Sequence, residues 1–185
     1  MASSKIYTEI EGHFLLARLN VKGIFARSVV WVVEFSEGKG ARGFILNRPT
    51  GKTLGVCSPN FAGTPLGDVP VLEGGPVGSG QLCFVLRSRA SADGKHHVRV
   101  GVRTEEIRDV IFNPGVRAYG FVGRAEWAPG QLEDEISRNT WMRVRMDADA
   151  WDAGGAEDFW RRLVAKIRKP EAELMLSAPS DLSAN

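Results

Sequence analysis

The sequence predicts an α+β fold built on a largely antiparallel sheet. Three short apolar runs lie close together near the start, at residues 14–17, 28–35 and 43–47. The last two are separated by a hexapeptide that contains glycine, residues 36–41, which is typical of a hairpin. Further strand patterns follow, whereas helical patterns are few and come late. This order favours separate sheet and helix regions over a regular alternation of strands and helices.

The run at residues 28–35 is the strongest strand pattern, because its valines and its tryptophan pack well on a pleated surface. Pro49 is expected to end the partner strand at 43–47, since proline cannot donate a ladder hydrogen bond. A short helical turn is expected at 54–57. Later strands are expected at residues 69–72, 82–87, 97–102, 117–122 and 142–146.

Helices are expected after Thr104, after Pro129 and over residues 156–168. Thr104 is a favourable N-cap, and Pro129 suits a first helical turn. Leu132 and Ile136 stand four residues apart and should both face the core. The last helix places its apolar side chains on one face, namely Phe159, Trp160, Leu163, Val164 and Ile167.

The chain of 185 residues suits one domain, which we expect to span residues 12–169. Residues 1–11 would form an N-terminal extension and residues 170–185 a disordered tail. The longest apolar run is far too short for the ~20 residues of a membrane helix, and no signal peptide is visible. We therefore expect a soluble cytoplasmic protein without a membrane partner.

Charge and cysteine content restrict the possible chemistry. The 24 basic and 22 acidic residues nearly cancel, whereas nucleic-acid-binding proteins usually carry a basic surplus. Cys57 and Cys83 are far apart, in apolar settings and without zinc spacing, so we interpret them as buried reduced thiols. His13 and the pair His96–His97 also lack neighbours at metal spacing. No metal and no cofactor is expected.

Two motifs that suggest catalysis are better explained structurally. Gly74-Gly75-Pro76 lacks the lysine of a phosphate-binding loop, so a bulge or tight turn is expected there. Ser28 has no nucleophile elbow and no assigned base. The sequence therefore predicts no catalytic residues, and we expect that the protein is not an enzyme.

Several blocks together resemble the YqgE/AlgH family. These blocks occur at residues 12–17, 27–30, 43–49, 74–77, 130–135 and 139–141. The sequence departs from the usual family pattern at 22–24, 80–83 and 125–127. The resemblance implies a compact α+β protein with bent, coiled sheets. It also implies a bacterial cytoplasmic protein of a family whose members are often described as transcriptional regulators.

Arg27, Asn47 and Arg48 are the first candidate binding residues. Arg48 and Asn47 stand at a strand end, where side chains often face a cleft. One interpretation is structural, with an arginine paired to a carboxylate and an asparagine that holds a turn. The other is an anion or carboxylate clamp in a cleft formed by Arg27 and Arg48, with Glu34 as the acidic partner.

A second candidate surface consists of Gln131, Glu135 and Asn139, which are four residues apart and share a helical face. Such a polar face is usually only solvated. The alternative is a face that contacts a partner or lines a groove, with Trp127 and Trp141 nearby.

The last helix carries a third set, namely the candidate nucleic-acid contacts Arg161, Arg162, Lys166 and Arg168. Glu157 and Asp158 dilute this basic face, and no recognised nucleic-acid-binding motif accompanies it.

Three functions remain open from the sequence. The favoured one is a non-enzymatic protein that acts through contacts with an unknown protein partner, as a transcriptional regulator. The alternatives are direct nucleic-acid binding by the last helix, and an anion-binding or enzymatic cleft at Arg27, Arg48 and Glu34.

Overall fold

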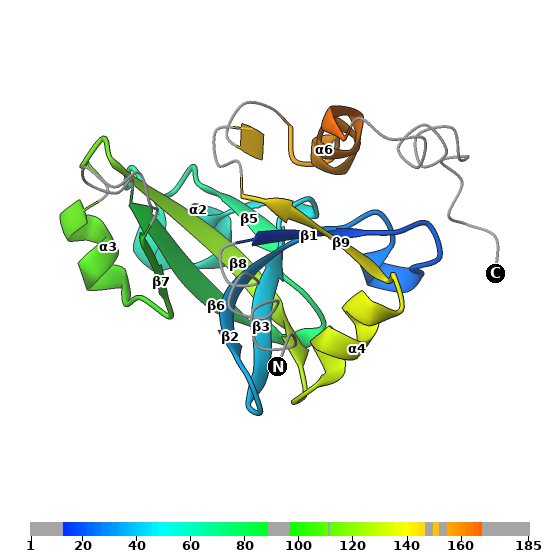
Figure 1. Ribbon diagram of the computed structural model, residues 1–185. Coiled ribbons are helices and arrows are strands. Elements are labelled where there is room, and N and C mark those ends of the chain that lie inside the picture. Colours follow the sequence, from blue (N-terminus) through cyan, green and yellow to red (C-terminus); the bar gives the residue numbers. More distant parts are fainter. Residues whose placement is uncertain (1–12, 89–96, 111, 147–149, 152–154, 168–185) are drawn as a thin grey trace. The chain divides into compact units, whose positions relative to one another are not determined.

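The computed structural model describes residues 13–88, 97–110, 112–146, 150–151 and 155–167. The chain divides into two compact units, Met1–Arg48 with Ala125–Asn185, and Pro49–Arg124. Strand β8 (Val116–Trp127) belongs to the second unit up to Arg124 and to the first from Ala125. The sheets are mixed but mostly antiparallel and carry few helices, which confirms the α+β class (Figure 1).

The first unit contains five neighbouring antiparallel strands. They are β1 (His13–Ala17), β2 (Val29–Ser36), β3 (Gly40–Ile45), β9 (Trp141–Arg145) and the end of β8, in the order β8-β3-β2-β1-β9. Val29 to Val32 are fully buried in the middle of this sheet. The valine-rich run is therefore the central strand that the sequence predicts, and the turn to β3 is shorter than expected.

The two faces of this sheet pack against different helices, as Figure 1 shows. Leu15 points toward helix α4 (Gln131–Ser137) and shares a core with Leu132. Phe14 points the other way, and its ring meets Phe159 of helix α6 (Phe159–Lys166) at 5.5 Å between centroids. The period of two along β1 thus gives each face its own core.

Helix α6 is shorter than the predicted 156–168 but buries the predicted stripe. Phe159, Trp160, Leu163 and Val164 are all buried. The Trp160 indole N–H donates to the Ala17 carbonyl at 3.0 Å, which attaches the helix to β1.

The 3-10 helix η1 (Gly23–Phe25) leads from β1 into β2. In the second unit the elements are β4 (Pro49–Thr53), α2 (Leu54–Cys57), η2 (Pro59–Phe61), β5 (Pro70–Glu73), β6 (Val77–Ser88), β7 (His97–Val100), α3 (Thr104–Val110) and the start of β8. Strand β6 lies between β7 and β8, antiparallel to both, whereas β5 runs parallel to β8. Gly74-Gly75-Pro76 connects β5 to β6, as predicted.

Three local predictions are wrong. Pro49 does not end β3, which stops at Ile45, but begins β4, because the first position of a strand tolerates a missing N–H. Thr104 is the first residue of α3, one position later than an N-cap, and its hydroxyl donates to the Glu105 carboxylate. Cys57 is exposed and Cys83 is half-buried, so neither thiol is fully buried, although both are unbridged.

Some predictions fall outside the described residues, namely the extension at 1–11, the tail at 170–185, and the residues His96 and Arg168. The single domain over residues 12–169 stays a prediction. In the described part of the chain, no helix has the length and apolar character needed to cross a membrane.

Candidate functional site

Three arginines from separate segments of the first unit line one pocket of about 370 Å³, which we call the arginine pocket. Arg27 follows η1, Arg48 follows β3, and Arg161 lies in α6. The remaining lining residues are Gly23, Ala26, Asn47, Glu157 and Trp160. The structure thus brings together one complete candidate set, Arg27 with Asn47 and Arg48, and one member of the basic set on the last helix, Arg161.

Asn47 holds the backbone of this pocket in place. Its side chain is only 2% exposed. The amide oxygen accepts a hydrogen bond from the Val29 backbone N–H at 2.8 Å, and the amide nitrogen donates to the Arg27 carbonyl at 2.9 Å. Both bonds cross from the end of β3 to the start of β2. Asn47 therefore has a structural role, although these bonds join two strand ends and do not hold the local turn that was predicted.

Backbone carbonyls orient the Arg48 guanidinium. Its Nη1 donates to the carbonyl of Asn47 at 3.0 Å, and its Nη2 donates to the carbonyl of Ala26. These contacts fix the side chain before any ligand arrives, so less conformational entropy would be lost on binding.

Arg27 has a left-handed backbone, with φ of 51°. This region costs a residue other than glycine roughly 1–2 kcal/mol. The Arg27 guanidinium lies over the Trp160 ring, 5.8 Å from its centroid. Backbone strain of this kind is found preferentially at functional sites, so Arg27 is the residue that most strongly marks this pocket.

The part of the arginine pocket lined by Arg161 and Glu157 carries both a positive and a negative charge. The side chains of Arg161 and Glu157 are exposed. Three guanidinium groups and one carboxylate leave a formal charge of +2 among the lining residues. An arginine-rich lining of this kind favours carboxylate or phosphate oxygens as ligands.

The predicted basic face of the last helix is split. Arg161 lines the arginine pocket, but Arg162 donates to the Gly155 carbonyl at 2.9 Å and lies over the Phe159 ring. Lys166 is exposed at the end of α6. Arg168 lies outside the described residues, so nucleic-acid contact by the whole set stays a prediction.

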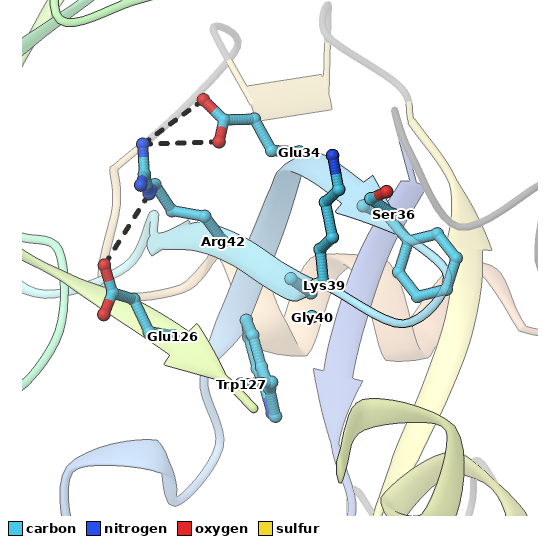
Figure 2. A pocket seen from close by; sticks show the side chains of 9 residues that line it. Glu34, Ser36, Lys39, Gly40, Arg42, Glu126 and Trp127 are labelled. Atoms are coloured by element: carbon cyan, nitrogen blue, oxygen red, sulfur yellow. Dashed lines mark hydrogen bonds and ion pairs between the residues drawn. The ribbon is translucent and has the colours of Figure 1, made fainter. Parts of the chain in front are cut away.

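Glu34 does not join Arg27 and Arg48, and this expectation is wrong. It lines another pocket, the hairpin groove at β2, β3 and β8, of about 480 Å³. Figure 2 shows Arg42 between Glu34 and Glu126, with nitrogen to oxygen distances of 3.3 and 3.7 Å. The alternation of side chains along β2 places Glu34 beside the neighbouring Arg42 of β3 and away from the strand ends.

Glu135 is a structural partner of two tryptophans. One of its carboxylate oxygens, Oε2, accepts hydrogen bonds from the indole N–H groups of Trp127 and Trp141, at 3.0 and 2.7 Å. Gln131 donates to the other oxygen at 2.9 Å. Trp127 and Trp141 lie nearby as expected, but they are only 6% and 4% exposed, and Glu135 occupies their indole N–H groups.

Asn139 lies beyond the end of α4, with a left-handed φ of 58°. Its backbone N–H donates to the Ile136 carbonyl at 3.0 Å and so closes the helix. Asn139 therefore does not share the helical face of Gln131 and Glu135, although it lines a different pocket, described below.

Sequence reasoning missed two members of the arginine pocket, Glu157 and Trp160, and assigned Arg161 to a different site. The spacing of Glu157 and Arg161, four residues apart, indicates one helical face but not what that face meets. The described residues contain no cluster of three or more His, Cys, Asp or Glu side chains suited to a metal ion.

The fold and pocket define a small α+β protein with a mostly antiparallel sheet and a pocket lined by three arginines. The family model described as AlgH-like matches residues 14–171, and the chain belongs to this family. The resemblance noted from the sequence blocks is thereby confirmed.

The relatives cover most of the chain. A UPF0301 protein of Bordetella petrii is 35% identical over 77% of this chain and 75% of its own length. A UPF0301 protein of Saccharophagus degradans is 30% identical over 83% of this chain and 80% of its own.

Two solved structures share the fold. The solution structure of the AlgH protein from Pseudomonas aeruginosa has a TM-score of 0.65 and 26% identity, over 98% of this chain and all of its own. A crystal structure of a Corynebacterium diphtheriae protein has a TM-score of 0.68 at 23% identity, over 95% of this chain and 99% of its own.

Proposed function

We propose that this chain is a non-enzymatic cytoplasmic protein that regulates transcription through contact with a protein partner. The arginine pocket anchors that partner by holding an anionic group, either a carboxylate or a phosphate. The observation that carries the proposal is the convergence of Arg27, Arg48 and Arg161 on one pocket. Backbone contacts orient Arg48, and strain marks Arg27, as expected of a preorganised binding site.

The chemistry of the lining favours binding over catalysis. Arginine stays protonated at all ordinary pH values, so it cannot exchange protons as a general acid or base. The lining residues supply no hydroxyl, thiol or imidazole, and Glu157 is their only carboxylate. A pocket of this composition can hold an anion but lacks a nucleophile and an acid–base pair.

Direct nucleic-acid binding is the competing proposal. It is less well supported because the Arg162 guanidinium lies over the Phe159 ring and donates to the carbonyl of Gly155, which precedes α6. The net charge of +2 also provides little general attraction for phosphates.

The test is affinity purification of the full-length tagged protein from its native cells, with nuclease treatment of the extract. Arg161→Glu should reduce the recovered partner roughly tenfold or more, because it reverses one anchoring charge. Glu157→Gln should increase recovery, because it removes the one negative charge of the pocket. Arg42→Gln, in the hairpin groove, is the matched control and should leave recovery unchanged.

Three results would overturn the proposal. One is equal partner recovery with all variants, and another is complete loss of the partner on nuclease treatment. The third is turnover of a small ester, nucleotide or phosphoester by the purified protein that disappears in Arg48→Ala. Salt-sensitive binding of purified protein to DNA or RNA that is lost in Arg161→Glu with Arg162→Glu would support the competing proposal.

Two variants of Arg27 distinguish its effect on stability from its effect on partner binding. Arg27→Gly should be about 1 kcal/mol more stable than Arg27→Ala, because glycine adopts the left-handed backbone without the steric cost that alanine keeps. Both variants lack the guanidinium and should recover the partner equally poorly. Urea unfolding of the two variants measures the difference. Equal stabilities would show that the backbone at Arg27 is not left-handed in solution.

A further inference from the structure

A second basic pocket lies on strands β1 and β9 of the first unit, and we call it the β9 groove. Its volume is about 380 Å³. The polar lining consists of His13, Arg18, Asn139, Arg143 and Arg145, and no lining residue carries a carboxylate. The β9 groove is therefore more uniformly positive than the arginine pocket, which contains Glu157.

The strand register explains why these side chains gather. His13 lies opposite Arg145, and Leu15 lies opposite Arg143. Residues that are directly opposite share a face of the sheet, and Leu15 belongs to the core beneath α4. Arg143 and Arg145 therefore project on the α4 side, where α4 covers the Trp141 end of β9 and leaves both arginines exposed.

The same register shows which backbone groups of β9 face outward. The Arg18 N–H donates to the Thr140 carbonyl at 3.1 Å, so these two form a hydrogen-bonded pair. Hydrogen-bonded pairs alternate along an antiparallel ladder, so the backbone groups of Arg145 point away from β1. Among the strands that the structure describes, β9 pairs only with β1 and ends the sheet.

We propose that the β9 groove binds an acidic, extended segment of a protein partner. Arg143 and Arg145 are two residues apart on a strand, so their side chains repeat at about 6.6–6.8 Å along one face. An extended peptide with carboxylates at alternate positions has the same repeat. Its carboxylates face Arg143 and Arg145, while Arg18 adds a further positive charge in the same groove.

A peptide fits this groove better than a nucleic acid. Proteins that hold single strands use exposed aromatic rings as stacking platforms beside the basic residues. Trp141, the aromatic residue in the lining, is 4% exposed, and its indole N–H is bound by Glu135. The groove therefore offers arginine forks at strand spacing but no surface on which a base could stack.

The proposal is independent of the arginine pocket. Helices α4 and α6 lie on opposite sides of the sheet (Figure 1). The β9 groove includes Ile136 of α4, the arginine pocket includes Trp160 and Arg161 of α6, and the two share no lining residue. Either proposal can therefore fail alone.

The test is fluorescence anisotropy of the full-length protein with a labelled heptapeptide in which glutamate and valine alternate. The comparison peptide has the same composition with its four glutamates consecutive. We expect the alternating peptide to bind roughly fivefold more tightly, because it presents all its carboxylates on one face. Arg143→Glu with Arg145→Glu should weaken binding at least tenfold. Changing both residues to lysine, which keeps the charge, should retain most of the affinity, and Arg42→Gln, in the hairpin groove, should leave the affinity unchanged.

Circular dichroism of each variant checks the fold, which these exposed positions should not disturb. Equal binding of the two peptides would overturn the proposed register. An unchanged affinity in the double glutamate variant would overturn the site. Tighter binding of a single-stranded oligonucleotide of matched charge, lost in the same variant, would replace the peptide with a nucleic acid.

Discussion

Replacing Asn47 with leucine should lower the free energy of unfolding by about 3–5 kcal/mol, the largest effect we expect from one polar substitution. Leucine has a similar volume but leaves the Val29 N–H and the Arg27 carbonyl without their partner. Each buried polar group that loses its partner costs about 1–3 kcal/mol. Because Asn47 is 2% exposed and leucine fills the same space, water cannot readily replace the amide.

Urea unfolding measures this change, and thermal unfolding should show a midpoint lowered by roughly 10 °C. Asn47→Asp distinguishes the contributions of the two hydrogen bonds. It keeps an acceptor for Val29 but places a second oxygen against the Arg27 carbonyl, so we expect an intermediate loss.

Asn113→Leu is the matched control, because Asn113 is exposed and accepts one hydrogen bond, from Gly115. Asn113→Leu should lower the free energy of unfolding by much less than Asn47→Leu does.

Any partner retained by folded Asn47→Asp should also bind more weakly, because Arg27 and Arg48 lose the backbone that positions them. A midpoint for Asn47→Leu equal to that of the unmodified protein would contradict this account.

The apolar patterns were sufficient to predict the sheet. Val29 to Val33 are β-branched or aromatic residues with almost no polar interruption, so a buried strand was the natural outcome. The apolar stripe of α6 was equally visible in the helical spacing of its residues, and four of its members are buried in the structure. In both cases local periodicity and burial point to the same answer.

Element ends were predicted less well. The sequence places Pro49 as the end of a strand, but proline is also tolerated at a strand start, and tertiary pairing of β4 with β5 decides between the two. Nothing within a few residues of Pro49 carries that information.

The candidate sites show a similar limit. Arg27, Asn47 and Arg48 were found together because they flank paired strands that are near in sequence. Arg161 joins them only because α6 packs onto β1 through Phe159 and Trp160, which no local pattern specifies. The assignment of Glu34 to that cleft failed for the same reason, since its partner is decided by the β2–β3 register.

Replacing Glu135 with alanine should lower the free energy of unfolding by about 3 kcal/mol. One carboxylate oxygen serves two indole N–H groups, from Trp127 on β8 and Trp141 on β9. Hydrogen bonds to a charged group contribute about 1.5–3 kcal/mol each, and alanine removes both acceptors at once. The two rings pack edge to face at 6.2 Å, so losing their common partner should also loosen this contact.

Glu135→Gln should lower the free energy of unfolding less than Glu135→Ala does, because the single amide oxygen can still accept hydrogen bonds from both indole N–H groups. Glu133→Ala is the control on the same helix, since one Glu133 oxygen is buried without a hydrogen-bond partner among the described residues. It should leave stability unchanged or slightly increased.

Indole ¹H–¹⁵N resonances give a local readout of this arrangement. In Glu135→Ala the Trp127 and Trp141 signals should shift strongly, because both N–H groups lose a charged acceptor. The Trp160 signal should stay in place, because that indole donates to the Ala17 carbonyl instead. Unchanged Trp127 and Trp141 signals would show that Glu135 faces solvent, and this helical face would then again be a candidate partner surface.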